Sequence, residues 1–310
     1  MRILVTGSSG TIGTRLCEKL LELGHDVIGV DWKPNKWQPN VQKLTRSVDL
    51  RSENEVAALT KALAKEQPID AVFHLAANAR VYELVEDPVR ALDNVTTTFR
   101  TLELARTLGI KKILFSSSRE VYGNEVRQDA YPEDAVRIEH CESPYTASKI
   151  SGEAFVESYA RCYGLDAIIF RFSNVYGMYD DSERVVPLFI RRAQKNEALT
   201  VFGKDKRLDF TYIDDNVNGM ILGLQKFDAA KGETVNLGNS EGTTVIDLAE
   251  TVKRLKKSSS PIIIGESRRG EVTHYVADIT KARSLLGYKP VTPFAIGIQK
   301  AVEWYAEHPC

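Results

Sequence analysis

The chain has 310 residues and a formal net charge of −1, from 41 basic and 42 acidic residues. Hydrophobic residues make up 43% and charged residues 27%, as in an ordinary globular protein with a sizeable core. The balanced charge predicts no nucleic-acid partner, and no apolar stretch approaches membrane-spanning length. The N-terminus shows no signal-peptide pattern, and the four cysteines lack the spacing of metal ligands. We therefore expect a cytoplasmic protein without a metal site, a nucleic-acid partner or a membrane partner.

The N-terminal stretch has the pattern of a dinucleotide-binding βαβ unit. Glycines after a first strand let backbone N–H groups approach a pyrophosphate, and an acid after the second strand accepts hydrogen bonds from a ribose. Asp31 would repel a 2′-phosphate, so the pattern favours NAD over NADP, although Lys33 and Lys36 weaken that preference. The expected elements are a strand at 2–6, the turn Gly7-x-x-Gly10-x-x-Gly13, a helix at 11–23 and a strand at 27–30 that ends at Asp31.

Strands and helices continue to alternate as far as Gly177, which predicts a doubly wound parallel (Rossmann) sheet of the α/β class. After Gly177 the segments become shorter, which predicts a smaller mixed α/β domain that closes over the ligand edge of the sheet. We place the two domains at 1–177 and 178–310. The further strands are expected at 44–48, 70–75, 112–117 and 167–172, and the further helices at 53–65, 88–108, 215–224, 245–256 and 294–307.

A predicted helix that begins near Pro144 carries Tyr145 and Lys149 on one face, because these residues are four positions apart. Ser143 is suited to the N-cap and Pro144 to the first turn. A phenol titrates near ~10 in water, so it is a poor base at neutral pH. We expect the neighbouring ammonium to favour the phenolate and to lower the pKa of Tyr145. Such a pair also arises by chance on surface helices, so its meaning depends on the rest of the chain.

Five motifs, in this order, resemble those of the extended short-chain dehydrogenase/reductase family, in particular its NAD-dependent nucleotide-sugar epimerases and dehydratases. The resemblance covers nearly the whole chain and is specific for the family, but much less so for the substrate. The motifs are the glycine turn, His74-Leu75-Ala76-Ala77, Ser116-Ser117-Ser118-x-x-Val121-Tyr122-Gly123, Tyr145-x-x-x-Lys149 and Arg171-x-x-Asn174-Val175-Tyr176-Gly177.

The resemblance implies that Tyr145 exchanges a proton with a sugar hydroxyl, that Lys149 bonds the nicotinamide ribose, and that Ser118 shares the hydrogen bond to the reacting hydroxyl. Base and nicotinamide must then converge on one C–OH group. The other implied NAD contacts are Gly7, Gly10, Thr11, Ile12, Gly13, Asp31, Asp49, Leu50, Leu75, Ala76, Ala77, Asn94 and Ser116. The implied contacts to a nucleotide sugar, expected to be a UDP-sugar held mainly by residues 178–310, are Asn78, Arg80, Arg119, Asn174, Arg207 and Arg268.

One departure from the family pattern follows Ser118 directly. Arg119 and Glu120 stand where the family's 4,6-dehydratases carry an Asp-Glu pair, and a guanidinium that stays protonated cannot replace the acid. Glu120 matches the glutamate of dehydratases and of UDP-glucuronate decarboxylases. It is a candidate catalytic residue as a C5 base; the alternatives are a substrate ligand and a structural acid paired with Arg119.

A second departure is Leu208, which stands where relatives carry an arginine on the diphosphate. Either Arg207 binds the diphosphate in place of this arginine, or Arg268 and Asn174 bind the phosphates with fewer contacts.

The leading functional prediction is NAD-dependent 4-epimerisation of a nucleotide-diphosphate sugar, of the UDP-glucose/galactose or UDP-uronate type, through a transient 4-keto intermediate. The alternative begins with the same oxidation and continues with dehydration or decarboxylation by Glu120. A third hypothesis is a non-catalytic NAD-binding sensor, but such proteins usually lack the tyrosine or the lysine. The resemblance also implies a homodimer in which the 88–108 helix and the helix of Tyr145 form a four-helix bundle with their copies.

Overall fold

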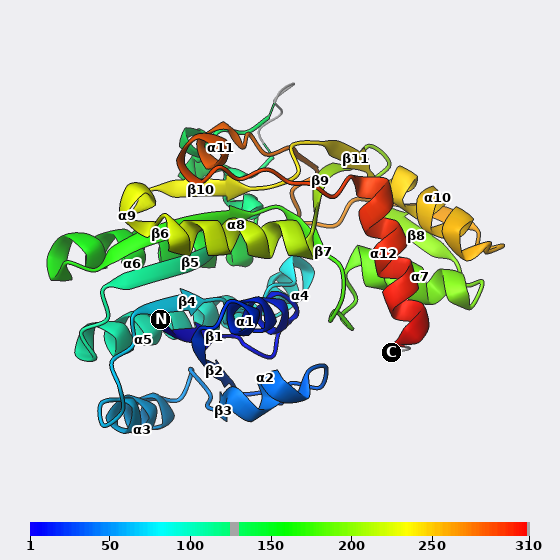
Figure 1. The fold of residues 1–310 in the computed structure, drawn as a ribbon. Coiled ribbons are helices and arrows are strands. Elements are labelled where there is room, and N and C mark those ends of the chain that lie inside the picture. Colours follow the sequence, from blue (N-terminus) through cyan, green and yellow to red (C-terminus); the bar gives the residue numbers. More distant parts are fainter. Residues whose placement is uncertain (125–129, 309–310) are drawn as a thin grey trace.

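The computed structural model describes residues 1–124 and 130–308. A seven-stranded parallel sheet lies at its centre, in the order β10-β6-β5-β4-β1-β2-β3 (Figure 1). The predicted α/β class and doubly wound sheet are confirmed. The strand order reverses between β1 and β4, which is where such sheets open a crevice for a dinucleotide. The strands are β1 (Arg2–Thr6), β2 (Asp26–Asp31), β3 (Thr45–Ser47), β4 (Ala71–His74), β5 (Lys112–Ser118), β6 (Asp166–Phe172) and β10 (Thr234–Leu237).

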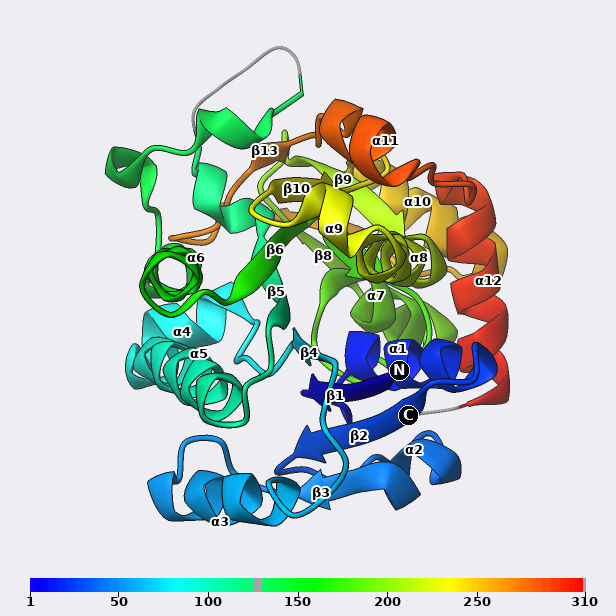
Figure 2. The ribbon, with the colours of Figure 1, turned by 60° about the vertical axis from the view of Figure 1, so that its left-hand side comes forward.

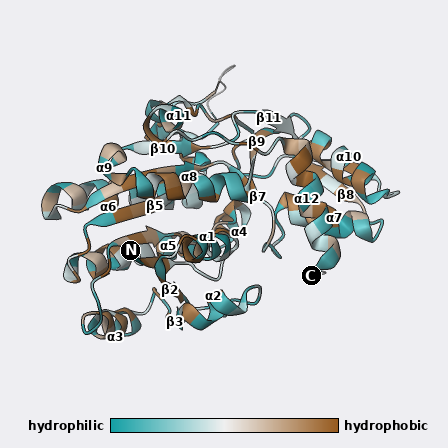
Figure 3. Ribbon diagram, in the orientation of Figure 1, coloured by the Kyte–Doolittle hydropathy of each residue, from teal (hydrophilic) through white to brown (hydrophobic). Residues whose placement is uncertain are grey.

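Helices cover both faces of the sheet (Figure 2). Neighbouring residues of a strand point to opposite faces, so Leu4 and Val5 of β1 belong to two different buried clusters. Leu16 of α1 packs in the cluster of Val5, and Leu102 of α5 packs in that of Leu4. Figure 3 shows hydrophobic residues on the central strands and on the sides of the helices that meet them. One face carries α1 (Thr11–Glu22) and α8 (Ile213–Gln225), and the other α3 (Glu53–Leu63), α5 (Val89–Thr107) and α6 (Pro144–Tyr163).

A second lobe lies beyond the carboxyl ends of the strands, on the right in Figure 1. Its helices are α7 (Val185–Gln194), α10 (Val245–Lys256) and α12 (Phe294–Glu307). In one small sheet β8 (Leu199–Phe202) pairs with β12 (Ile262–Gly265). In another, β9 (Arg207–Tyr212) pairs with β7 (Asn174–Tyr176), β11 (Gly242–Thr244) and β13 (His274–Tyr275). Short helices are α2 (Pro39–Leu44), α4 (Val81–Glu86), α9 (Phe227–Ala230) and α11 (Thr280–Leu286), and Arg119–Tyr122 forms a 3-10 turn.

Residues after 177 divide between the two lobes. Strand β10 extends the central sheet by pairing with β6, and α8 covers the same sheet. The two lobes therefore differ from the predicted domains, which divided the chain once, at residue 177. The physical reason lies in β6, whose residues Ala167–Phe172 are all buried and which would otherwise present an apolar, unpaired edge to water. The sequence also predicted a strand at 44–48, where the structure has the end of α2 followed by β3.

Helix α6 begins as its sequence predicts. The Ser143 side chain accepts a hydrogen bond from the Thr146 N–H at 3.2 Å, and Gly164 ends the helix in the left-handed conformation. In between, Gly152 lets the helix approach β5 closely, because a Cβ atom at this position would lie 2.6 Å from Cζ of the Phe115 ring. This approach fixes the height of α6 above the sheet.

We expect Gly152→Val to destabilise the protein by about 1–3 kcal/mol, because the buried Phe115 ring leaves no room for the added carbons. Denaturant unfolding would measure the loss. The control is Ala154→Val on the exposed side of the same helix, expected to change stability by less than about 0.5 kcal/mol. Equal effects of the two substitutions would contradict this account of the packing.

Candidate active site

A cleft of about 230 Å³ opens at the carboxyl ends of β1, β2 and β4, where the strand order reverses. Loops after these strands and the N-terminal half of α5 line it. Asn78, which the sequence assigned to the substrate, also lines this cleft. The predicted cofactor residues that line it are Gly7, Gly10, Asp31, Asp49, Leu50, Leu75, Ala76, Ala77 and Asn94.

The glycine turn forms a cradle that suits a pyrophosphate. Gly7 has φ +74°, and a Cβ atom there would lie 2.8 Å from the backbone nitrogen of Ala76. A Cβ atom on Gly13 would overlap the carbonyl of Gly7, so the loop can fold back only with glycine at this position. Ser9 borders the cleft, and its buried hydroxyl has no hydrogen-bond partner among the described residues. A phosphate oxygen would supply that partner, and the residues present therefore fit a dinucleotide.

Thr11, Ile12 and Gly13 lie behind the cradle, at the start of α1, and do not line the cleft. The Thr11 hydroxyl instead donates to the carbonyl of Tyr179 at 3.0 Å. This bond ties the beginning of α1 to the segment that follows β7.

Asp31, the last residue of β2, lines the cleft beside the glycine turn. Its carboxylate accepts hydrogen bonds from the backbone N–H groups of Ser9 at 3.0 Å and Lys33 at 2.9 Å. Burial raises the pKa of Asp31, and these bonds act in the opposite direction. The carboxylate is therefore held in place beside the glycine turn, as recognition of a ribose requires.

The part of the cleft beside Asp49 contains residues that the sequence analysis missed. Arg51 forms a salt bridge with Asp49 at 2.8 Å and places its guanidinium 4.8 Å from the centre of the Trp32 ring. Trp32 follows Asp31 directly, so its position in the sequence was the available signal. Thr97 lies one helical turn after Asn94, so helical spacing would have indicated it, and Asp93 lies one turn before Thr97. The missed lining residues are Ser9, Val30, Trp32, Lys33, Val48, Arg51, Asp93 and Thr97.

Ser118, Tyr145 and Lys149 meet where β5 ends beside the first turns of α6, and all three are buried. The Ser118 hydroxyl acts on the Tyr145 phenol in the direction that favours its ionised form and lowers its pKa. The Lys149 ammonium donates to the backbone carbonyl of Ser116 at 2.8 Å and lies 6.0 Å from the centre of the Tyr145 ring. The structure thus brings together the three residues that the sequence assigned to proton transfer.

The sequence predicted that Lys149 lowers the pKa of Tyr145. In the protein chain without a ligand this prediction is wrong, because the pKa of Tyr145 is raised. Burial raises the pKa of the Tyr145 phenol and outweighs the opposing effect of the Ser118 hydroxyl. Burial also lowers the pKa of Lys149 to about 8, because water no longer solvates its charge. The ammonium points toward Ser116 rather than the phenol oxygen, so its spacing on the helix did not determine its partner.

Asn94 joins three elements around the cleft. Its side chain accepts from the Asn78 N–H at 2.7 Å and donates to the Asn78 carbonyl at 3.0 Å and to the Ser148 hydroxyl at 3.2 Å. Since Ser148 precedes Lys149 on α6, these bonds fix the two helices relative to the loop after β4.

Arg119 and Glu120 form a buried ion pair, with 2.7 Å between Nη2 and Oε1. Burial raises the pKa of Glu120, while the charges of Arg119 and Lys206 act in the opposite direction. Of the three roles that the sequence left open for Glu120, this geometry matches the structural acid paired with Arg119.

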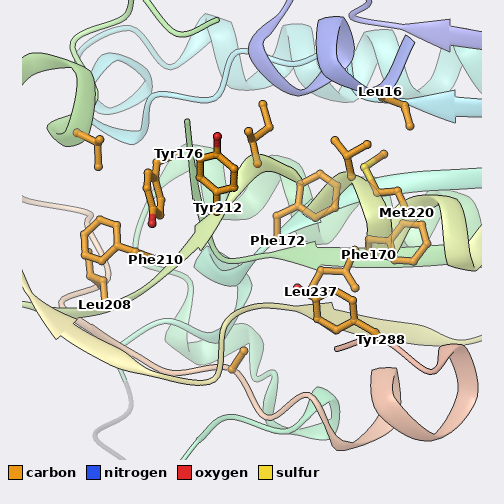
Figure 4. Close-up of a cluster of buried hydrophobic side chains, with 14 of the residues drawn as sticks. Leu16, Phe170, Phe172, Tyr176, Leu208, Phe210, Tyr212, Met220, Leu237 and Tyr288 are labelled. Atoms are coloured by element: carbon orange, nitrogen blue, oxygen red, sulfur yellow. The ribbon is translucent and has the colours of Figure 1, made fainter. Parts of the chain in front are cut away.

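The remaining predicted arginines lie apart from one another. Arg80 forms an ion pair with Glu83 at 2.5 Å. Arg207 is exposed and donates to the carbonyl of Gly242 at 3.1 Å, so it does not take the place of the missing arginine. Leu208 is buried instead, in the hydrophobic cluster that contains Phe210 (Figure 4).

Arg268 lies between two aromatic rings. The centre of its guanidinium is 4.0 Å from the ring of Phe202 on β8 and 4.8 Å from that of Tyr82 on α4. Asn174 donates its side-chain amide to the carbonyl of Asp209 at 3.1 Å. Arg268 is thus the predicted phosphate ligand that bridges the two lobes.

No group of three or more potential metal ligands occurs within residues 1–124 and 130–308. Across the same residues, no helix combines the length and apolar character needed to cross a bilayer.

Comparisons with known proteins agree with this architecture. Residues 3–238 match the model of the NAD dependent epimerase/dehydratase family. The chain belongs to this family. It is an NAD-dependent enzyme of the extended short-chain dehydrogenase/reductase type, as the five motifs indicated.

Individual members of the family are similar over their whole length. A UDP-glucose 4-epimerase of Mycolicibacterium smegmatis is 32% identical over 98% of each chain. The structure of a UDP-glucose 4-epimerase of Thermotoga maritima with UDP-glucose is 31% identical, with a TM-score of 0.90 over 99% of both chains. That of a UDP-glucuronic acid 4-epimerase of Bacillus cereus with UDP-glucuronic acid and NAD is 28% identical, with a TM-score of 0.89 over 99% of this chain and 100% of the other.

The stability of this protein should depend on pH because of His74, the first residue of the His-Leu-Ala-Ala motif. It is buried between the hydroxyls of Thr6 at 2.7 Å and Thr98 at 3.1 Å, and burial lowers its pKa to about 3. Below pH ~6.5 the unfolded chain takes up a proton on this histidine, but the folded chain does not until pH falls to about 3. Stability from this group is therefore lost as pH falls through that window, by about 1.4 kcal/mol per pH unit.

His74→Gln removes this titration. We expect the free energy of unfolding of the wild type to approach that of the variant by about 2 kcal/mol between pH ~7.5 and ~5. Denaturant unfolding at the two pH values measures the change, and a gap that stays constant would contradict the assignment of a neutral His74.

Proposed function

We propose that the protein interconverts the C4 epimers of a UDP-sugar through a 4-keto intermediate. The observation that carries the proposal is the buried group of Ser118, Tyr145 and Lys149, which Asn94 and Ser148 connect to the cleft that suits NAD. The 4-epimerases among the similar proteins support this choice of reaction and of nucleotide.

In this proposal Tyr145 accepts the proton of the C4 hydroxyl and later returns it, while Ser118 orients that hydroxyl by sharing its hydrogen bond. NAD, when bound, supplies the acceptor and donor of hydride at the same carbon. To accept the hydroxyl proton, Tyr145 must be a phenolate when the reaction begins. Burial raises the pKa of its phenol, so positive charge near Tyr145 must offset the effect of burial. Burial of the pair also keeps water away from the keto sugar.

The cofactor contacts proposed for this reaction are those along the cleft, together with Lys149 and Ser116. Lys149 and the Ser116 carbonyl lie beside Tyr145, where the nicotinamide ribose must be for hydride and proton to leave the same carbon. Asp31 and its backbone partners are proposed to bind the adenosine ribose, and Asp49 and Leu50 to border the adenine.

Dehydration or decarboxylation remains the alternative, since the family contains dehydratases. Both need an additional acid or base after the oxidation, for which the sequence offers Glu120. In the structure Arg119 occupies one oxygen of Glu120 and the Val272 N–H the other. Isomerisation needs no such group, and the geometry therefore favours it.

Tyr145→Phe should lower kcat by roughly 100- to 10,000-fold, because the substitution removes the group that moves the proton and leaves the cleft unchanged. The amount of NAD released on denaturation should stay the same. Conversion of UDP-glucose to UDP-galactose, and of UDP-glucuronate to UDP-galacturonate, would be followed by chromatography with mass detection. The control is Tyr163→Phe, at the exposed end of the same helix.

Undiminished turnover by Tyr145→Phe would reject the proposed proton transfer. A product lighter by water or carbon dioxide would instead support the alternative reaction.

We also propose that the protein is a homodimer formed through α5 and α6. Val89, Leu92 and Phe99 follow one another along one face of α5 and are exposed, with Leu92 64% accessible. Phe99 continues this apolar surface toward Phe155 of α6, with 6.0 Å between the ring centres. A second copy would cover such a surface, and four helices would then pack together.

Leu92→Glu combined with Phe99→Glu should yield a monomer, because a dimer would bury the new charges without partners. Light scattering coupled to size exclusion measures the mass. Ile296→Glu on α12, also an exposed apolar position, is the control and should leave the dimer intact. A wild-type protein with the mass of one chain would refute the dimer itself.

A cytoplasmic location is part of the proposal. Cys141 and Cys162 are exposed free thiols, which are usual in a reducing compartment.

A further inference from the structure

Arg119 and Glu120 contact both backbone polar groups of one distant residue. The Arg119 guanidinium donates to the Val272 carbonyl at 3.4 Å, and the Glu120 carboxylate accepts from the Val272 N–H at 3.3 Å. The two side chains are also joined to each other at 2.7 Å. Val272 is fully buried, so these side chains satisfy backbone groups that water cannot reach. The two side chains thus form the hydrogen bonds to the Val272 backbone that a neighbouring β-strand would form.

The residues around Val272 are fastened to the same region of the molecule. Glu271 forms an ion pair with Lys206 at 2.6 Å and accepts at its carbonyl from the Asn124 side chain at 3.0 Å. Asn124 in turn accepts from the Thr273 N–H at 2.7 Å. Gly270, at φ +77°, lies so close to α4 that a Cβ atom would be 2.9 Å from the Val85 side chain. Residues 268–273 therefore rest on the turn that follows β5 and on α4.

A buried ion pair is costly unless hydrogen bonds satisfy its remaining atoms. Glu120 meets this condition only in its present place, since Oε1 faces Arg119 and Oε2 faces the Val272 N–H. Turning the carboxylate toward a substrate would leave the Arg119 charge and the Val272 N–H without these partners. Both oxygens of Glu120 are therefore used to hold Arg119 and Val272 in place, an arrangement we call the anchor. A general base would need an oxygen free to reach the substrate.

We infer that Arg119 and Glu120 are positioning residues, which hold segment 268–273, and with it Arg268, at a fixed place beside Ser118. The inference rests on the proposed function in one respect, namely that Arg268 binds the diphosphate of the substrate. Ser118 immediately precedes the pair, so the group that orients the sugar and the arginine that would hold the phosphates are joined through one residue, Val272. The pair thereby sets the distance between the two ends of the substrate.

Glu120→Gln separates positioning from proton transfer. A glutamine amide oxygen can still accept from the Val272 N–H but cannot act as a base. Its NH2 group then faces Arg119 in place of a carboxylate oxygen, so the variant should lose stability, but kcat of the folded variant should stay within about fivefold of the wild type. The pH dependence of kcat should also keep its shape. A loss of about 100-fold or more in kcat at unchanged KM would show that Glu120 takes part in the chemistry, and would overturn the inference.

The double substitution Arg119→Met with Glu120→Leu tests the anchor without leaving a single buried charge behind. Hydrogen–deuterium exchange of the backbone amides in 268–273, measured by mass spectrometry, should become at least tenfold faster than in the wild type. With the NAD-loaded protein, the Kd for UDP and the KM for the UDP-sugar should each rise by about tenfold, whereas kcat should fall less than KM rises. Wild-type exchange and wild-type UDP affinity would overturn the inference.

Arg119→Lys is the second variant, in case the double variant does not fold. A lysine keeps the charge opposite Glu120 but lacks the fork that also reaches the Val272 carbonyl, so exchange in 268–273 should again be faster. Unchanged exchange in this variant would also contradict the anchor. Hydrogen exchange is measured without substrate, so it tests the anchor even if the protein proves to act on no UDP-sugar. Failure of the proposed function can therefore be distinguished from failure of the anchor.

Discussion

The site depends on the close packing of α6 against β5. Gly152 brings the helix onto the Phe115 ring, and Lys149 donates to the carbonyl of Ser116, so helix and strand are fixed at two points. Tyr145 lies one turn before Lys149 and thereby meets Ser118, the last residue of the strand. A shift of the helix by a fraction of an ångström would separate the phenol from the hydroxyl, and proton transfer is sensitive to such distances.

The same packing explains why the electrostatics differ from those of the isolated tyrosine–lysine pair. Placing both side chains inside the protein removes water from the phenol and from the ammonium, which raises the pKa of Tyr145 and lowers that of Lys149. A phenol that is to accept a proton must first ionise, so Tyr145 needs positive charge in its neighbourhood before the proton moves. The fold can meet that need because the cleft that suits NAD lies beside this pair.

Specific hydrogen bonds connect the second lobe to the first. Tyr179 bonds to the start of α1, and Val272 bonds to Arg119 and Glu120. Each contact attaches the second lobe close to an end of a central strand, where ligands bind in this class of sheet. The substrate would therefore lie between groups whose separation is set by these contacts.

The amino-acid sequence by itself determined the sheet, the glycine turn with Asp31, and the helix that carries Tyr145 and Lys149. These features depend on local signals, namely the period of apolar residues, a helix cap and positions that only glycine can occupy. The tertiary structure decided which partners the charged residues take. Lys149 faces Ser116, Arg207 turns to Gly242, and Glu120 bonds to Val272, 152 positions away in the chain. Such pairings depend on burial and on contacts between segments that are distant in the sequence. The spacing of residues along the chain gives no information about either.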